Sequence, residues 1–99
     1  IMGETGIKPI VIEEICDLAK KYNVKKVILF GSRARGSFKE KSDIDLLICV
    51  DIKGIKFFGL VEELRLSLCK KVDALDINQI NNNPDLAKEI LKDGIKIYG

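Results

Sequence analysis

The residues best suited to chemistry form two short motifs. Gly31 and Ser32 directly follow the apolar run at residues 27–30, and Asp43 and Asp45 open the next apolar run. A small-residue turn can wrap phosphate oxygens with backbone N–H groups, and paired carboxylates can hold divalent cations. Together the two motifs suggest a site for a nucleoside triphosphate.

The aspartate pair lies in a predicted strand, where residues i and i+2 point to the same face. Asp43 and Asp45 therefore project together, and their repulsion raises one pKa unless a cation neutralises them. Mg²⁺ meets that need with oxygen ligands and normally arrives with phosphates in its other positions. The alternative is a polar start to a strand, with Ser42 and Asp43 as turn residues, and for an isolated Asp-x-Asp pair this alternative is the better one.

A third acid favours the metal-binding interpretation over the polar strand start. Asp73 lies inside another predicted strand, and because neighbouring strands are about 4.8 Å apart it could meet the first pair across the sheet. Three carboxylates on one face would hold two ions about 3.5–4 Å apart, which suits an in-line phosphoryl displacement. In a chain without histidine, Asp73 would also accept the proton of an attacking hydroxyl. Asp76 is the rival, and we expect it to be solvated at the strand end.

The Gly31-Ser32 turn has two interpretations, an ordinary loop or a phosphate-binding turn. Gly31 lets a ligand approach the backbone closely, and Ser32 adds a hydroxyl to a segment with free N–H groups. Arg33 and Arg35 either touch phosphate or are solvated, and the sequence does not choose between these. Gly36 allows the chain to turn back. The P-loop and dinucleotide-binding patterns are both absent.

Composition indicates one soluble domain over residues 1–99, with 46% hydrophobic and 32% charged residues. The net charge of +2 without a clustered basic face argues against direct nucleic-acid binding. The absence of histidine excludes Ser-His and Cys-His dyads and His-containing zinc sites. Cys16, Cys49 and Cys69 lie in apolar patterns without C-x-x-C spacing, which predicts reduced core thiols in a cytoplasmic protein. No signal peptide or membrane span is predicted, and Met2 is a candidate natural start.

Hydrophobic periodicity predicts helices alternating with strands. The expected helices begin at Pro9, run from Phe57 to Lys71 and extend from the Asn83 cap to Gly94, with a turn or very short helix at 32–37. In the last helix the predicted buried face consists of Leu86, Ala87, Ile90 and Leu91. Strands are expected at 24–30, 43–50, 72–77 and, as an edge strand, 95–98. Only about eleven residues join the first two strands, which is tight for a parallel crossover. We therefore predict an α/β (α+β) fold, a mixed sheet of about four strands flanked by helices.

The combined motif resembles the nucleotidyltransferase superfamily that includes DNA polymerase beta, whose signature is Gly-Ser, a spacer, Asp-x-Asp and a later strand Asp. More narrowly it is similar to the minimal nucleotidyltransferase (MNT) domain, through FGSRARGSFKEKSDIDLL at 30–47, KVD at 71–73 and ILKDG at 90–94. The resemblance implies Mg²⁺-dependent transfer of a nucleoside monophosphate, usually from ATP, onto a hydroxyl. By match to the motif, Gly31 and Ser32 would bind the triphosphate and Asp43 and Asp45 both metals. Asp73 would bind the catalytic metal and help deprotonate the acceptor.

The same resemblance implies a partner. Family members of this size are often antitoxins paired with HEPN-domain ribonucleases, and some are similar to enzymes that attach AMP to a tyrosine of that toxin. The leading hypothesis is therefore AMP transfer from ATP, with two Mg²⁺ ions, to a HEPN-type toxin. The alternatives are a non-catalytic antitoxin that acts by complex formation, and transfer to a small molecule. No membrane or nucleic-acid partner is expected.

Overall fold

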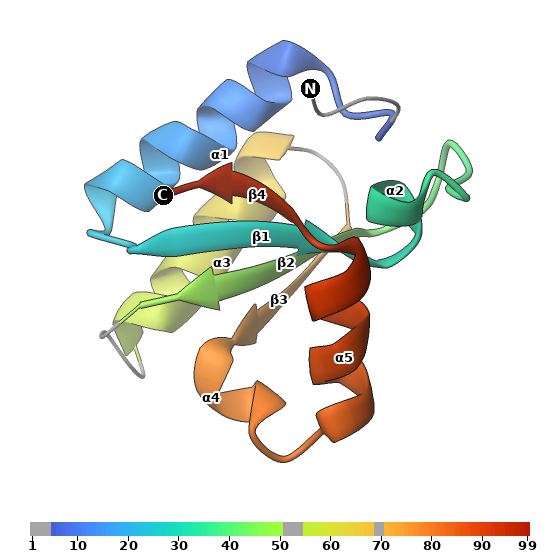
Figure 1. Cartoon of the computed structure of the whole chain (residues 1–99). Helices are drawn as coiled ribbons and strands as arrows, with labels where there is room; N and C mark the ends of the chain where they lie inside the picture. The colour runs from blue at the N-terminus through green and yellow to red at the C-terminus, as the bar shows by residue number, and fades with distance from the viewer. Residues whose placement is uncertain (1–4, 51–54, 69–70) are drawn as a thin grey trace.

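The computed structural model describes residues 5–50, 55–68 and 71–99 (Figure 1). Met2, Cys69 and Lys70 lie outside the described residues, and Lys71, the predicted last residue of the third helix, is not helical. The elements in chain order are α1 (Pro9–Lys21), β1 (Lys26–Phe30), α2 (Gly31–Arg35), β2 (Ile44–Cys49), α3 (Ile55–Leu68), β3 (Val72–Asp76), α4 (Ile77–Ile80), α5 (Pro84–Asp93) and β4 (Ile95–Tyr98).

The four strands form one mixed sheet in the order β3-β2-β1-β4, which confirms the predicted fold class. β1 runs antiparallel to both β2 and β4, while β2 and β3 are parallel. The short connection through α2 allows only the antiparallel pairing of β1 with β2. The longer connection through α3 provides the crossover that a parallel pair requires.

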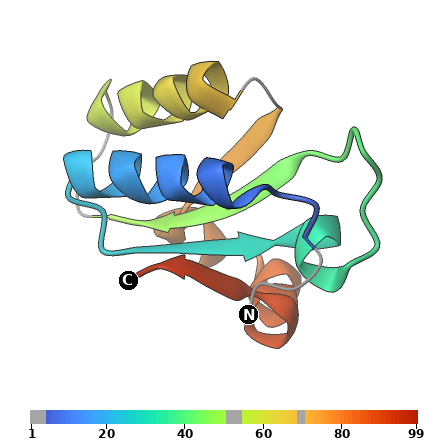
Figure 2. The same cartoon turned by 90° about the horizontal axis from the view of Figure 1, so that it is seen from above.

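Helices cover both faces of the sheet (Figures 1 and 2). α1 and α3 lie on one face, and α2, α4 and α5 lie on the other. The α1/α3 face carries the larger core, because alternate strand residues point into it. Its most buried members are Ile15, Leu29, Ile44, Leu46, Ile48, Leu60, Leu64 and Val72. The opposite face has a smaller cluster around Phe30, Leu47 and Ile90. No described helix is long and apolar enough to cross a bilayer.

Local signals place most element ends. Pro9 occupies the first turn of α1, and Asn23, just beyond that helix, has a φ of 57°. Gly36 ends α2 with a φ of 83°, a left-handed conformation that favours glycine. The side chain of Asn83 accepts a hydrogen bond from an N–H of the first turn of α5. Gly94 ends that helix in an extended conformation instead.

Two sequence-based expectations at the C-terminal half are wrong. Ile77 was expected to end the third strand, but it begins α4 because Asp76 and Gln79 form a capping box. The Asp76 carboxylate accepts from the Asn78 N–H at 3.1 Å, so Asp76 lies at the strand end as predicted but serves as a helix cap. Leu91 was assigned to the buried face of α5 and is 87% exposed. The other three residues of the predicted face agree with the structure, since Ile90 is buried and Leu86 and Ala87 are half-buried.

The two described cysteines carry free thiols. Cys16 and Cys49 are half-buried, and burial is the main factor that raises the pKa of each thiol. A raised thiol pKa lowers the thiolate fraction and hence the reactivity of both side chains. They are therefore inert packing residues, as predicted, although they lie at the margin of the core.

Candidate active site

Asp45 and Asp73 lie directly opposite each other on neighbouring strands. The parallel pairing of β2 and β3 puts the two residues in register. Leu47 belongs to the cluster beneath α5, and Asp45, two positions earlier, points to the same face. Asp45 is half-buried, whereas Asp73 is exposed at the outer strand of the sheet. The structure thus brings together the two aspartates that the sequence placed on separate strands.

The electrostatics of this pair depend on a third aspartate. Burial is the largest influence on Asp45, followed by the charges of Asp73 and Asp43, and together they raise its pKa from 3.8 to about 6. A hydrogen bond between the Asp45 and Asp73 carboxyl groups and the charge of Glu89 act in the same direction. A carboxylate under such repulsion gains when a cation neutralises it. The charges of Asp43 and Asp73 therefore both act on the carboxyl group of Asp45.

The arrangement is not a finished metal site in the protein alone. Across residues 5–50, 55–68 and 71–99, no three His, Cys, Asp or Glu side chains are grouped so that they could hold a metal ion. The predicted three-carboxylate cage is therefore not preassembled. Carboxylates repel one another when no cation neutralises them. The donor set nevertheless fits Mg²⁺, because this ion takes oxygen ligands and is usually held by one or two carboxylates together with substrate phosphates.

The Gly31-Ser32 turn lies against the Asp45 side chain. Phe30, the last residue of β1, is paired with Asp45, so the turn that follows passes directly over that carboxylate. Gly31 is buried and has a φ of 76°. A Cβ atom at this position would overlap the Oδ2 atom of Asp45. Both the backbone angle and the close approach therefore require glycine, and both predicted motifs meet at one place.

Arg33 has neither of the two roles that the sequence allowed. Its side chain is 2% exposed, so it is not solvated, and its guanidinium donates to the carbonyls of Thr5 at 3.0 Å, Glu40 at 3.2 Å and Ser42 at 2.9 Å. It also stacks over Phe38, with 5.2 Å between the guanidinium carbon and the ring centroid. Arg33 is buried, and its hydrogen bonds link α2 to the segment that leads to β2. Only tertiary structure could show this, because its partners are backbone carbonyls.

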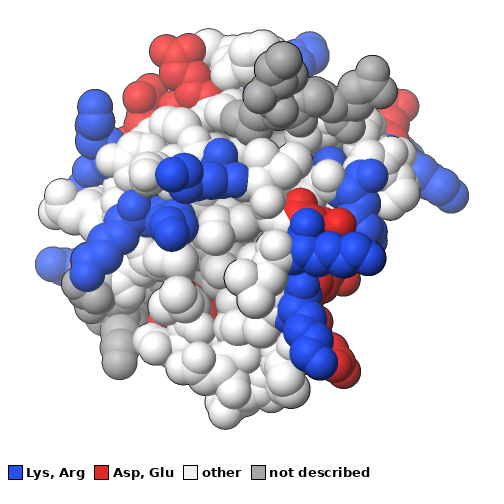
Figure 3. Space-filling view, in the orientation of Figure 1, with Lys and Arg blue, Asp and Glu red and all other residues white. Residues whose placement is uncertain are grey.

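Arg35 lies on the surface and forms an ion pair with Glu89 of α5 at 3.3 Å. Figure 3 shows acidic and basic side chains next to each other along the side of the molecule that α2 and α5 form. Glu89 also raises the pKa of Asp45, which places this pair at the margin of the site. Sequence reasoning missed Glu89, because the orientation of α5 over the sheet carries no local signal.

The profile of the family described as polymerase beta, nucleotidyltransferase, matches residues 13–99. The chain belongs to this family. Its site geometry agrees with that membership, since the Gly-Ser turn, the Asp-x-Asp pair and the later strand aspartate of the signature lie together at one end of the sheet.

Several proteins are similar to this nucleotidyltransferase along most of its length. A presumed protein adenylyltransferase of Methanocaldococcus jannaschii is 39% identical over 84 residues, which cover 81% of this chain and 83% of that protein. The protein adenylyltransferase MntA of Thermococcus cleftensis is 32% identical over 85 residues and 82% of each chain. The curated relatives are thus matched over nearly their whole length.

Solved structures share the fold. A presumed minimal nucleotidyltransferase has a TM-score of 0.70 and 28% identity, covering 85% of this chain and 86% of its own. The complex of a tri-AMPylated Shewanella oneidensis HEPN toxin with an MNT antitoxin gives a TM-score of 0.71 at 20% identity, covering 94% of this nucleotidyltransferase and 73% of that chain. At that identity the second likeness concerns the fold alone.

Proposed function

We propose that this nucleotidyltransferase transfers AMP from Mg²⁺·ATP to a tyrosine hydroxyl of a HEPN-type toxin and thereby acts as its antitoxin. The observation that carries the proposal is the Asp45–Asp73 pair beneath the Gly31 turn. Support comes from the relative named protein adenylyltransferase MntA and from the AMPylated HEPN toxin bound to an antitoxin of the same fold. We place this enzyme in the cytoplasm, where ATP is available.

In this proposal the acidic residues have distinct roles. Asp43 and Asp45 would hold two Mg²⁺ ions, and Asp73 would be a further ligand of one of them. When bound, the ions neutralise the triphosphate and the charge that develops on the leaving group. The pKa of about 6 at Asp45 means that a proton competes with the metal for this carboxylate in mildly acidic solution.

The chain's own groups would bind the substrates and move the proton. Backbone N–H groups of the Gly31-Ser32 turn hold the triphosphate, and the missing side chain of Gly31 lets the Asp45 carboxylate lie directly against this turn. The tyrosine oxygen attacks the α-phosphorus and the bond to the β-phosphate oxygen breaks, so pyrophosphate leaves. The tyrosine proton passes to Asp73. This carboxylate is exposed on an edge strand, where a side chain from another protein can reach it.

Substitution of the aspartates tests the catalytic roles. We expect Asp45→Asn to abolish incorporation of radioactive AMP into the toxin, because it removes the carboxylate between the other two. Asp73→Asn should abolish transfer but retain ATP binding in calorimetry, since its main role concerns the acceptor. Asp17→Asn, at an exposed position of α1, is the matched control and should retain full activity. Undiminished labelling by Asp45→Asn would refute the assignment.

One observation favours a second function. Within the described part of the chain, no three potential ligands form a finished metal cage, and an antitoxin that acts only by complex formation needs none. Mass spectrometry of the partner after incubation with the protein and Mg²⁺·ATP separates the two functions. Added AMP on the partner supports the enzyme, whereas a tight and unmodified complex supports the binding module.

A further inference from the structure

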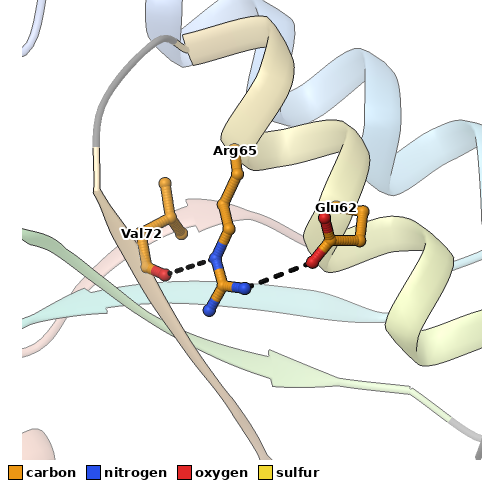
Figure 4. Close-up of polar contacts among 3 residues, drawn as sticks. All are labelled: Glu62, Arg65 and Val72. Carbon is orange, nitrogen blue, oxygen red and sulfur yellow. Dashed lines mark hydrogen bonds and ion pairs between the residues drawn. The ribbon is translucent and has the colours of Figure 1, made fainter.

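A cation on α3 contacts the backbone directly before Asp73 (Figure 4). The Nε atom of Arg65 donates to the carbonyl of Val72 at 3.2 Å, and its Nη1 atom donates to the carboxylate of Glu62, one helical turn earlier, at 3.2 Å. The Val72 carbonyl and the Asp73 N–H belong to the same planar peptide unit. Arg65 therefore holds the peptide plane from which the Asp73 side chain projects.

The position of β3 explains why this contact matters. β3 is an edge strand whose partner is β2. The carbonyl of Lys71 accepts from the Ile44 N–H at 2.9 Å, and the next carbonyl along a strand points the opposite way. The Val72 carbonyl therefore points away from the sheet, where no further strand can fix it, and Arg65 supplies the hydrogen bond.

The same relation occurs at another aspartate of the site. Arg33 donates to the carbonyl of Ser42 from Nε at 3.1 Å and from Nη2 at 2.9 Å, and Ser42 directly precedes Asp43. Two arginines on different helices thus each donate to the carbonyl before a site aspartate. Arg33 is fully buried, whereas the Arg65 side chain is 48% exposed, so Arg65 is the one that can be replaced without rebuilding the core.

We infer that Arg65 is a positioning residue for Asp73, acting through the Val72–Asp73 peptide unit. The inference rests on the proposed role of Asp73 as acceptor of the tyrosine proton. A displacement of about 1 Å in a catalytic group can cost about 100-fold in rate, and an edge strand that is paired on one side only is less restrained against such displacements. Arginine suits this task because its planar fork holds the carbonyl and the Glu62 carboxylate together.

The simpler alternative is that Arg65 only stabilises the surface. Its partner Glu62 is 44% exposed, and ion pairs of this kind contribute little to stability. The two explanations predict different kinetics. A stabilising role lowers the thermal midpoint and leaves kcat unchanged, whereas a positioning role lowers kcat while the ATP-binding turn on α2 keeps its affinity.

The test compares Arg65→Met with Lys21→Met. Lys21 pairs with Glu63 of α3 at 2.8 Å and donates its hydrogen bond to that glutamate rather than to β3, so it controls for loss of a cation that binds an α3 glutamate. We expect Arg65→Met to lower kcat for AMP transfer by about 10- to 100-fold, with KM for ATP within about twofold. Arg65→Lys should fall between Arg65→Met and wild type. Lys21→Met should retain kcat even where its thermal midpoint falls further.

A measurement without substrate makes the result independent of activity. In ¹⁵N–¹H spectra of the apo protein, Arg65→Met should shift the backbone amide of Asp73 and of Asp45 opposite it, and Lys21→Met should leave both in place. A wild-type kcat with unshifted amides in Arg65→Met overturns the inference. Absence of transfer by wild type and Lys21→Met alike would instead refute the proposed function, and the amide shifts would still decide whether Arg65 orients Asp73.

Discussion

Replacing Asp45 with asparagine should stabilise the metal-free protein at neutral pH. In the native state Asp45 is half-buried and faces the charges of Asp73 and Asp43, which raise its pKa to about 6. In the unfolded chain the carboxyl group returns to its ordinary value near 3.8. The native state therefore binds a proton on Asp45 more tightly than the unfolded state does, so ionisation of this group opposes folding.

The sign and size of the effect on stability follow from the difference between the native and the unfolded pKa of Asp45. Between about pH 4 and pH 6 the native protein retains the proton that the unfolded chain has lost, so stability falls as pH rises through this window and is constant above it. The full difference in pKa corresponds to about 3 kcal/mol. Because Asp45 is partly open to solvent, we expect about 1–2 kcal/mol in practice. Asparagine cannot ionise and avoids this loss.

Urea unfolding at pH 4 and pH 7.5, with a chelator present, measures the effect. The free energy of unfolding of Asp45→Asn should exceed that of wild type by about 1–2 kcal/mol at pH 7.5, and the difference should shrink towards zero at pH 4. The exposed control Asp17→Asn should stay within about 0.5 kcal/mol of wild type at both pH values. An Asp45→Asn protein that is less stable than wild type at pH 7.5 would refute the electrostatic argument.

Adding Mg²⁺·ATP should make the wild type more stable than Asp45→Asn. Wild type in Mg²⁺·ATP at 100 times its Kd gains about 2.7 kcal/mol, because the ligand binds the native state and not the unfolded chain. Asp45→Asn should gain much less, since it has lost a proposed metal ligand. Equal gains for both proteins would mean that Asp45 does not contribute to binding of the nucleotide complex.

Four further substitutions test the fold around the site. Gly31→Ala should abolish nucleotide binding in calorimetry, because its φ of 76° disfavours a side chain and the new Cβ would overlap the Asp45 carboxylate. Ile90→Ala should lower the free energy of unfolding by about 2–4 kcal/mol, whereas Leu91→Ala, at an 87% exposed position, should change it by less than about 0.5 kcal/mol. Asn83→Ala should cost about 1 kcal/mol in urea unfolding, because it removes the side-chain cap of α5.

The sequence was sufficient wherever a local pattern decides the structure. The strands around the Asp-x-Asp pair, the left-handed Gly36 after α2 and the Asn-Pro start of α5 follow from pattern and backbone chemistry. The short link between β1 and β2 correctly excluded an all-parallel sheet. The convergence of Asp73 with Asp45 was also predictable, because an acid flanked by apolar strand residues has few other reasons to be there.

One of the failures was readable in the sequence, whereas the others have physical causes that a linear pattern does not contain. Ile77 has the composition of a strand residue, and only the Asp76–Gln79 capping box, itself a recognisable sequence signal, shows that a helix begins there. Leu91 fits the helical period, but the angle at which α5 lies on the sheet buries Ile90, as predicted, and leaves Leu91 exposed. Arg33 binds backbone carbonyls, and these partners have no signature in the sequence.

The positions where this chain departs from local preference lie together. Asp45 and Asp73 occupy strands that disfavour aspartate, and Gly31 adopts a φ of 76° against the Asp45 carboxylate. All of them belong to the end of the sheet beside α2, whereas the strand residues facing α1 and α3 are regular and apolar. Burial of the regular apolar face stabilises the fold, whereas ionisation of Asp45 destabilises it. The local conflicts are therefore the cost of holding a cation-binding site at one end of an otherwise ordinary sheet, and removing the Asp45 carboxylate should increase stability and decrease activity together.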